Sequence, residues 1–391
     1  MKYFILVGEA SGDLHASNLL QALREQDPQA VFVGLGGDKM QAQGCHLYQH
    51  YRQMAFMGLA DVLRNLGKVK HNLSLAQEAL LHERPDVLIL VDYPSFNLRI
   101  AKFCRRALPG TKIVYYIPPK IWAWKRWRVH TIAKVCDRVL GIFPFEPAFY
   151  QRFGYECTYV GNPTVDELAP VVAEPFDRDD FCRRHEVNAN QSIIALLPGS
   201  RKAEVNDNLP LMLEAATTIS CHQLIIAGAP GLTPDFYERI IRRYQMVPPV
   251  RIVFGETYNL VRAAEVAAVT SGTATLETAY LRCPQVVCYR FGGGKLVYSI
   301  MKQVLRHIRF VSLVNLVIDG FSKEHPLIDP AVPELLGYKC TSQELHQHLV
   351  SLSGESEARS RMLAQYEEMI RILGAPGAPV RAAEEILRHL H

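Results

Sequence analysis

The sequence predicts an α/β protein built from two Rossmann-like domains that face a central cleft, with a helical segment at the C-terminus. Short apolar runs that end in Gly, Pro or Asp alternate with helical patterns in both halves, which is typical of parallel sheets covered by helices. A chain of 391 residues is also too long for one ordinary core. We expect an N-terminal domain over 1–168, a second domain over 181–340, and C-terminal helices over 341–391.

The strand predictions follow from apolar runs bounded by turn residues. In the first half we expect strands at 3–7, 31–34, 87–91, 112–117 and 138–141, with a turn over 8–13 and a helix over 14–24. In the second half we expect strands at 193–197, 223–227, 251–254, 266–270 and 285–289. Residues 169–180 contain two prolines and several acids, so we predict a linker there.

Composition narrows the class of protein. An apolar content of 49% and a charged content of 21% are typical of soluble globular proteins. Nine scattered cysteines without Cys-x-x-Cys spacing favour reduced thiols in the cytoplasm over a zinc site or disulfides. No signal-peptide pattern opens the sequence, and no apolar run approaches the ~18 residues of a membrane span. We therefore expect a protein that is neither secreted nor integral to a membrane.

The charge is uneven along the chain. Residues 1–165 carry 20 Lys and Arg against 13 Asp and Glu, whereas the remainder carries 23 against 26. A basic first half favours an anionic partner, either a phosphorylated ligand or an acidic lipid surface. We expect no nucleic-acid partner, because no nucleic-acid motif appears and the net charge is only +4.

The strand predicted at 193–197 ends in the turn Pro198-Gly199-Ser200, followed by Arg201. Ligands bind at the carboxyl ends of strands in open α/β sheets. Gly199 allows close backbone approach, and the Arg201 guanidinium is a permanently charged fork suited to phosphate oxygens. The pattern fits an anion site, and equally an ordinary strand-to-helix turn with an exposed arginine.

A second anion site is predicted after the strand at 266–270. Ser271, Gly272, Thr273 and Ala274 open a helix whose first amide N–H groups are free to bind a diphosphate. Glu277, one turn into the helix, can reach ribose hydroxyls. The alternative is a plain helix cap with Glu277 favoured by the helix dipole.

Asp92 directly follows the fully apolar strand at 87–91. Partial burial at that edge of the sheet raises the pKa of a carboxyl toward that of a general base. An aspartate before a turn also hydrogen-bonds to local backbone, and the sequence leaves both interpretations open.

Aromatic and apolar clusters in the first half suggest contact with a sugar or lipid. Trp122 and Trp124 lie among cations, which suits a membrane interface, stacking on a sugar, or a buried aromatic cluster. An amphipathic stripe that covers acyl chains or faces the core comprises Met54, Phe56, Met57, Leu59, Val62, Leu63 and Leu66.

Histidines provide weaker candidates. His15, beside Asp13, can orient a substrate hydroxyl, although capping or packing explains it as well. No histidine pair has metal-ligand spacing, so we expect no catalytic metal.

Taken together, these motifs resemble those of the lipid-A-disaccharide synthase family in order and spacing, from residue 3 to about 316. The matching runs are Gly8-Glu-Ala-Ser-Gly-Asp13, Trp122-Ala-Trp124, Leu197-Pro-Gly-Ser-Arg201, Ser271-Gly-Thr-Ala-Thr-Leu-Glu277 and Val311-Ser-Leu-Val-Asn-Leu316. Pro118-Pro119 replaces the usual Ser-Pro of that family, and 319–337 is longer and richer in proline than its pattern.

The resemblance implies a GT-B type glycosyltransferase fold and an inverting reaction without a cofactor. The substrates would be UDP-2,3-diacylglucosamine and 2,3-diacylglucosamine 1-phosphate, and the products a β(1→6) lipid A disaccharide 1-phosphate and UDP. Asp92 matches the family's catalytic aspartate, and Arg201, Glu277 and Asn315 match its nucleotide-site positions. Ser11 belongs to the first motif and is a candidate for the acceptor loop. The enzyme would work at the inner face of the inner membrane of a Gram-negative cell. We also keep a homo-oligomer as an expectation.

Two other functions compete with this one. A UDP-N-acetylglucosamine 2-epimerase has the same architecture, but its Asp-Ser-Gly-Gly loop is replaced here by Thr270-Ser-Gly-Thr273. A non-enzymatic lipid-surface adaptor fits the amphipathic stripe, yet gives no reason for Arg201, Glu277 and Asp92 to occur together.

Overall fold

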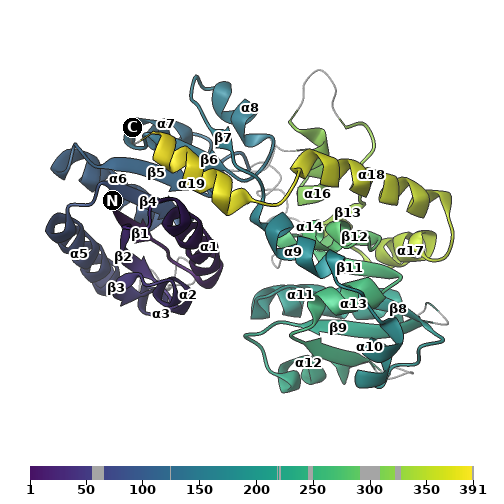
Figure 1. The fold of residues 1–391 in the computed structure, drawn as a ribbon. Helices are drawn as coiled ribbons and strands as arrows, with labels where there is room; N and C mark the ends of the chain where they lie inside the picture. Colours follow the sequence, from purple (N-terminus) through teal and green to yellow (C-terminus); the bar gives the residue numbers. More distant parts are fainter. Residues whose placement is uncertain are drawn as a thin grey trace. The chain divides into compact units, whose positions relative to one another are not determined.

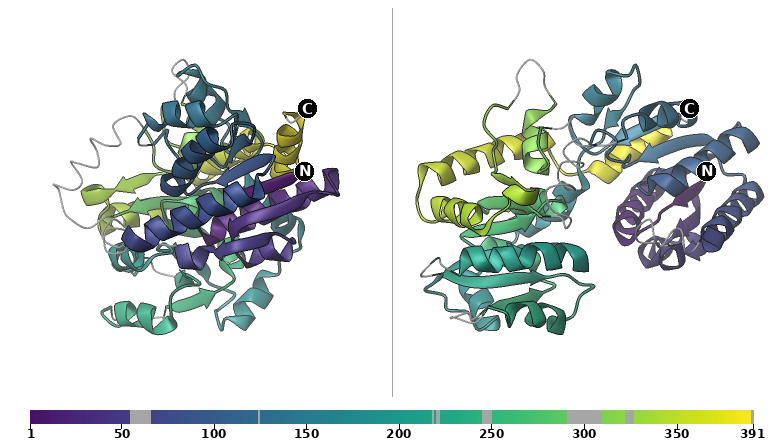
Figure 2. Two further views of the ribbon diagram at one scale, coloured as in Figure 1. Left: turned by 90° about the vertical axis from the view of Figure 1, so that its left-hand side faces the viewer. Right: turned by 180° about the vertical axis from the view of Figure 1, so that it is seen from behind.

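The chain folds into two compact units, Met1–Pro163 with Ala375–His391 and Thr164–Gly374. The computed structural model describes residues 1–54, 66–123, 125–217, 219, 222–244, 250–290, 309–321 and 327–389. In each unit a parallel sheet lies between helices on both faces (Figures 1 and 2).

The sheet of the first unit has seven strands within the described residues, in the order β3-β2-β1-β4-β5-β6-β7. All pairings are parallel. The strands are β1 Lys2–Leu6, β2 Val31–Gly36, β3 His46–His50, β4 Val87–Val91, β5 Lys112–Tyr116, β6 Arg138–Gly141 and β7 Thr158–Tyr159. The two strands that meet at the centre, β1 and β4, are almost entirely buried because they are covered on both faces.

The helices of this unit are α1 Ala10–Gln26, α2 Asp38–Ala42, α3 Tyr51–Met54, α5 Leu66–Glu83, α6 Pro94–Ala107, α7 Arg128–Val135, α8 Glu146–Gln151 and α19 Ala378–Arg388. The last helix, α19, packs beside α1 (Figure 1). Its Ala382, Ala383 and Ile386 side chains are buried in the same core as the sheet. Arg381 fixes this helix, because its guanidinium donates to the carbonyl oxygens of Val160 (2.8 Å), Ala375 (3.0 Å) and Pro376 (3.0 Å).

The sheet of the second unit has six parallel strands within the described residues, in the order β10-β9-β8-β11-β12-β13. The strands are β8 Ser192–Leu197, β9 His222–Gly228, β10 Arg251–Phe254, β11 Val266–Thr270, β12 Gln285–Tyr289 and β13 Glu334–Leu336. The helices are α9 Pro163–Ala173, α10 Arg178–Arg184, α11 Lys202–Ala216, α12 Pro234–Ile241, α13 Thr257–Ala263, α14 Thr273–Tyr280, α16 Leu313–Asp319, α17 Ser342–Leu352 and α18 Glu357–Leu373, with a 3₁₀ turn Gly337–Lys339.

Three features differ from the sequence-based prediction. The expected linker over 169–180 is mostly helical, because α9 accommodates Pro170 and the Asp177 carboxylate caps α10 by accepting from the Asp180 amide (3.0 Å). The first helix begins at Ala10, so most of the predicted turn over 8–13 is already helical. The edge strands β3 and β13 were not predicted.

The expected C-terminal segment 341–391 is divided in the structure. Helices α17 and α18 belong to the second unit, whereas α19 returns to the first. Sequence periodicity predicts that these helices form, but the partner of each helix depends on contacts across the chain.

Each sheet reverses its strand order once, between β1 and β4 in the first unit and between β8 and β11 in the second. Loops diverge at such a reversal and leave room for a ligand at the carboxyl ends of the strands. Asp92 follows β4, Arg201 follows β8 and Ser271 follows β11, so three of the main candidates lie at these reversals. Among the described helices, none has the length and apolar character needed to cross a membrane.

Candidate active site

Asp92 lies at the strand reversal of the first unit in a left-handed backbone conformation. Asp92 and Tyr93 both have a φ of 44°, which non-glycine residues rarely adopt. The Asp92 carbonyl oxygen accepts hydrogen bonds from the Tyr115 hydroxyl (2.7 Å) and the Asn97 side-chain amide (2.7 Å). Because these two contacts hold the turn, the strain at this position is supported by the surrounding structure.

Burial raises the pKa of the Asp92 carboxyl to about 6. The Glu9 carboxyl adds to the rise by like-charge repulsion, whereas the Lys120 ammonium opposes it. A carboxyl with a pKa near 6 is ionised at neutral pH and basic enough to accept a proton from a hydroxyl. This is the property that the sequence predicts for a general base.

Asp13, from the first sequence motif, has a structural role. Its buried carboxylate accepts from the amide N–H groups of Gly37 (2.8 Å), Lys39 (3.0 Å) and Met40 (3.2 Å), at the start of α2. A β-carbon on Gly37 would lie 2.6 Å from the Asp13 Oδ2 atom, so this loop requires a glycine. The contacts join α1 to the loop after β2.

We expect Asp13→Ala to lower the free energy of unfolding by about 3 kcal/mol, because it leaves three amide donors without their charged acceptor. Urea unfolding followed by circular dichroism measures the change. Asp38→Ala is the control, since that carboxylate side chain is 68% exposed and its removal should cost less than about 1 kcal/mol. Equal losses in the two variants would contradict the role given to Asp13.

The other acceptor candidates of the first unit have different environments. Ser11 is exposed, and its hydroxyl donates to the Glu9 carboxylate (3.2 Å). Burial and the Lys39 charge lower the pKa of His15 to about 4, so this imidazole is neutral at pH 7. Trp122 is 3% exposed and packs edge-on against Phe145, with ring centroids 5.2 Å apart. Trp122 therefore belongs to a buried aromatic cluster, and Trp124 lies outside the described residues.

Of the predicted acyl-chain stripe, the structure describes one side chain, that of Met54. Met54 is 1% exposed, so this side chain belongs to the core of the unit and does not face lipid. Leu66 begins α5, and its side chain is not described. Phe56, Met57, Leu59, Val62 and Leu63 lie outside the described residues.

Arg201 lies at the strand reversal of the second unit, immediately before α11. The Glu204 carboxylate caps the turn by accepting from the amides of Ser200 (3.0 Å) and Arg201 (3.3 Å). Gly199 has a φ of 116°, and a β-carbon there would lie 2.6 Å from the Glu204 Cβ atom. The Arg201 side chain is 69% exposed, and its ion pair with Glu204 is long, at 3.7 Å. Its guanidinium is therefore available to a ligand.

The loop that starts at Ser271 follows the neighbouring strand. Because Leu197 pairs with Val269, the residues after β8 and β11 leave the sheet side by side. Gly272 precedes α14, no side chain caps the helix, and a β-carbon added to Gly272 would have open space around it. The Ser271 hydroxyl donates to the Val311 carbonyl oxygen (3.4 Å). Thr273 and Ala274 form the first turn of the helix and are at least partly exposed.

Glu277 lies one turn into α14. Its pKa is raised to about 7, mainly by burial and in part by the nearby Glu167 carboxyl, while a hydrogen bond with Thr273 opposes the rise. A carboxyl of this kind is a strong hydrogen-bond acceptor when ionised and a donor when protonated, and it can bind a sugar hydroxyl in either form.

Asn315, which the resemblance assigns to the nucleotide site, lies on α16. The residue is fully buried on α16. Its amide nitrogen donates to the Val332 carbonyl oxygen (2.9 Å) and to Glu334 Oε1 (2.8 Å), while its oxygen accepts from the Val332 amide (3.0 Å). Both amide hydrogens are therefore used within the protein. Glu334 in turn accepts from the Val311 amide (2.9 Å), so Asn315 supports the loop that meets Ser271.

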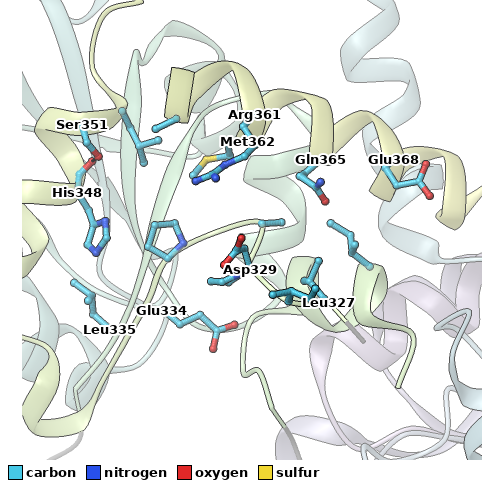
Figure 3. A pocket seen from close by; sticks show the side chains of 17 residues that line it. Leu327, Asp329, Glu334, Leu335, His348, Ser351, Arg361, Met362, Gln365 and Glu368 are labelled. Atoms are coloured by element: carbon cyan, nitrogen blue, oxygen red, sulfur yellow. Dashed lines mark hydrogen bonds between the residues drawn. The ribbon is translucent and has the colours of Figure 1, made fainter. Parts of the chain in front are cut away.

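A cavity of about 960 Å³ also lies in the second unit, lined by α16, α17, α18 and the segment 327–335 (Figure 3). Asp329, Met362, Gln365 and Arg361 are among its lining residues. None of the nucleotide candidates lines it, so we do not assign it to the reaction. The described residues contain no group of three or more His, Cys, Asp or Glu side chains placed to hold a metal ion.

Sequence reasoning did not single out Glu9 or Lys120, which both interact electrostatically with Asp92. A usable signal was present, because each residue follows a strand adjacent to β4: Glu9 follows β1 and Lys120 follows β5. Sequence reasoning also did not single out Glu204, whose carboxylate caps the Arg201 turn.

Comparisons with known proteins agree with this architecture. A family model described as lipid-A-disaccharide synthetase matches residues 3–375. The lipid-A-disaccharide synthase of Myxococcus xanthus is 36% identical over 395 residues, covering 100% of this chain and 97% of that protein.

Solved structures show the fold alone. A putative UDP-N-acetylglucosamine 2-epimerase from Listeria monocytogenes has a TM-score of 0.61 at 12% identity, covering 99% of this chain and 94% of its own. A glycosyltransferase from Rickettsia africae has a TM-score of 0.58 at 12% identity, covering 100% and 98%. The family model and the full-length relative decide between these architecturally similar classes: the chain belongs to the lipid-A-disaccharide synthetase family of glycosyltransferases.

Proposed function

We propose that the protein joins UDP-2,3-diacylglucosamine to 2,3-diacylglucosamine 1-phosphate, with inversion at the anomeric carbon, to give the β(1→6) lipid A disaccharide 1-phosphate and UDP. Family membership supports the reaction. One observation carries the residue assignment: the candidate base lies at the strand reversal of the first sheet, and the candidate groups for binding the donor lie at the strand reversal of the second.

In the proposed reaction the second unit binds the donor. The amides of 272–274 and the Arg201 guanidinium neutralise the diphosphate as the sugar–phosphate bond breaks and UDP leaves with the bonding electrons. Glu277 accepts from ribose hydroxyls. Asn315 acts indirectly, because its contacts support the loop next to Ser271.

The first unit supplies the base. Asp92 accepts the proton of the acceptor 6-hydroxyl as that oxygen bonds to the anomeric carbon from the face opposite UDP. The raised pKa supports this role, because a base whose pKa lies just below the working pH is mostly ionised and still strongly basic.

We propose that the enzyme works in the cytoplasm at the inner face of the inner membrane, where acylated substrates are embedded. The excess of cations in residues 1–165 supports contact with an anionic lipid surface. Co-sedimentation with vesicles that contain or lack anionic lipid measures that contact. The homo-oligomer remains a prediction, which light scattering checks.

The test of the reaction is incubation with the two acylated glucosamine substrates, followed by mass detection of the disaccharide and of UDP. Formation of both products in equal amounts is the expected result. A parallel incubation with UDP-N-acetylglucosamine alone examines the epimerase alternative. Appearance of the 2-epimer without disaccharide in the first reaction would replace this proposal, and absence of UDP binding would favour the adaptor.

A further inference from the structure

The carboxylate of Glu334, the first residue of β13, accepts hydrogen bonds on both of its oxygens. Oε2 accepts from the Val311 amide (2.9 Å), and Oε1 accepts from the Ser312 amide (2.8 Å) and from the Asn315 side-chain amide (2.8 Å). Three donors at two oxygens favour the ionised form of the carboxyl. Glu334 therefore ties β13, the edge strand of the second sheet, to the start of α16.

The segment that Glu334 holds also contacts the loop after β11. The Val311 amide donates to Glu334, and the Val311 carbonyl oxygen accepts from the Ser271 hydroxyl (3.4 Å). Ser312, the next residue, caps α16, because its hydroxyl accepts from the Val314 amide (3.2 Å). Hydrogen bonds thus run from Glu334 through residue 311 to Ser271, which opens the proposed diphosphate loop.

Asn315 provides an anchor that does not depend on Glu334. Its side chain is fully buried and exchanges two hydrogen bonds with the Val332 backbone, of 2.9 Å and 3.0 Å. Because these bonds join α16 to the segment before β13, the helix should stay in place when Glu334 is replaced. The Glu334 carboxylate adds control over the two residues before the helix, 311 and 312.

We infer that Glu334 is a positioning residue for the sugar-nucleotide donor: it holds Val311 in the place that supports Ser271, and so fixes the amides of 272–274 for the diphosphate. Glu334 touches no substrate in this assignment, because its oxygens bind donors within the protein. The inference rests on the proposed function, in which that loop binds the diphosphate. Its expected effect is on donor affinity, whereas a purely structural carboxylate would affect stability alone.

Glu334→Gln tests the inference. Glutamine keeps one oxygen but turns an NH₂ group toward one of the backbone donors, so either Val311 or Ser312 loses its acceptor. The Kd for UDP, measured by calorimetric titration, should rise roughly tenfold, the effect of losing one hydrogen bond to a charged group. An unchanged Kd would overturn the inference.

Asp329→Asn is the matched control for this variant. It makes the same change of charge at an exposed carboxylate five residues earlier, and its UDP affinity should equal that of wild type. Glu334→Asp, shorter by one methylene group, is the second variant if glutamine prevents folding. It keeps the charge but not the reach, so its Kd should also rise.

A double-mutant cycle tests the route through Ser271. Ser271→Ala removes the hydroxyl that joins the loop to Val311, and so should weaken UDP binding by itself. If Glu334 acts through that contact, Glu334→Gln should change the Kd less in the Ser271→Ala background than in wild type. Two losses that simply multiply would show that Glu334 acts independently of Ser271 and would contradict the inference.

Hydrogen exchange followed by mass spectrometry gives a readout that does not depend on UDP or on activity. Glu334→Gln should speed exchange in peptides that contain residues 311–312 and 271–274, and should leave the peptides of β9 as in wild type. Faster exchange there with an unchanged Kd would overturn the inference, because the loop would not bind the diphosphate. If the wild-type protein binds no UDP, it is the proposed function that fails, whereas wild-type binding with an unchanged Kd in Glu334→Gln removes the inference alone.

Discussion

Asp92→Asn is expected to lower kcat by about 10²- to 10⁴-fold, the range attributed to a general base. Asparagine has nearly the same shape, and the Tyr115 and Asn97 contacts to the Asp92 backbone do not depend on the carboxylate. The fold should therefore be retained. UDP affinity should also be retained, because the proposed nucleotide residues belong to the other unit. Steady-state kinetics and calorimetric titration with UDP measure the two properties.

The pH dependence of wild-type kcat/KM should also reflect the loss of the ionised Asp92 carboxylate. The pKa of Asp92 is raised to about 6, so the ionised base is depleted as pH falls through 6, and kcat/KM should fall tenfold per pH unit below it. Asp38→Asn removes an exposed carboxylate from the same unit and should have normal turnover. Normal turnover in Asp92→Asn would remove Asp92 from the mechanism.

Arg201→Ala is expected to lower kcat/KM for the UDP-sugar by about 10²- to 10³-fold. Loss of one preorganised donor to developing negative charge has an effect of this size. Because the side chain is 69% exposed, its removal should change the free energy of unfolding by less than about 1 kcal/mol. Arg201→Lys should give an intermediate loss, since an ammonium keeps the charge but not the two-pronged geometry.

The matched control for Arg201 is Arg183→Ala. Arg183 is also an exposed arginine of the second unit, 75% exposed, and it pairs with Asp180 three residues away, as Arg201 pairs with Glu204. Calorimetry with UDP should show weaker binding for Arg201→Ala alone. Similar UDP affinities for wild type and Arg201→Ala would place the diphosphate elsewhere.

The inner strands were predictable from local sequence. The predicted bounds of the strands at 87–91, 138–141, 251–254, 266–270 and 285–289 agree with those of β4, β6, β10, β11 and β12. These runs are apolar and end at turn residues, so their position depends on little beyond their own composition. The edge strand β3 has the sequence His-Leu-Tyr-Gln-His and is only partly buried, and β13 has three residues. Neither gives a local signal strong enough to predict a strand.

Within the candidate site, only the residues that directly follow a strand were predictable from the sequence. The turn before Arg201, the loop at Ser271 and the carboxylate at Asp92 were identified because each follows an apolar run. The burial of Asn315 was not predictable from the sequence, because both of its amide hydrogens bind groups 17 to 19 residues further along the chain.

By itself the sequence determined the two parallel sheets, the turns that carry the charged candidates and the order of the family motifs, because apolar runs and turn residues act over a few neighbouring positions. Only the tertiary structure decided that Asp13 binds the amides at the start of α2, that Asn315 supports a loop, and that α19 returns to the first unit. Those outcomes depend on which strands pair and which side chains are buried together, and no local pattern contains that information.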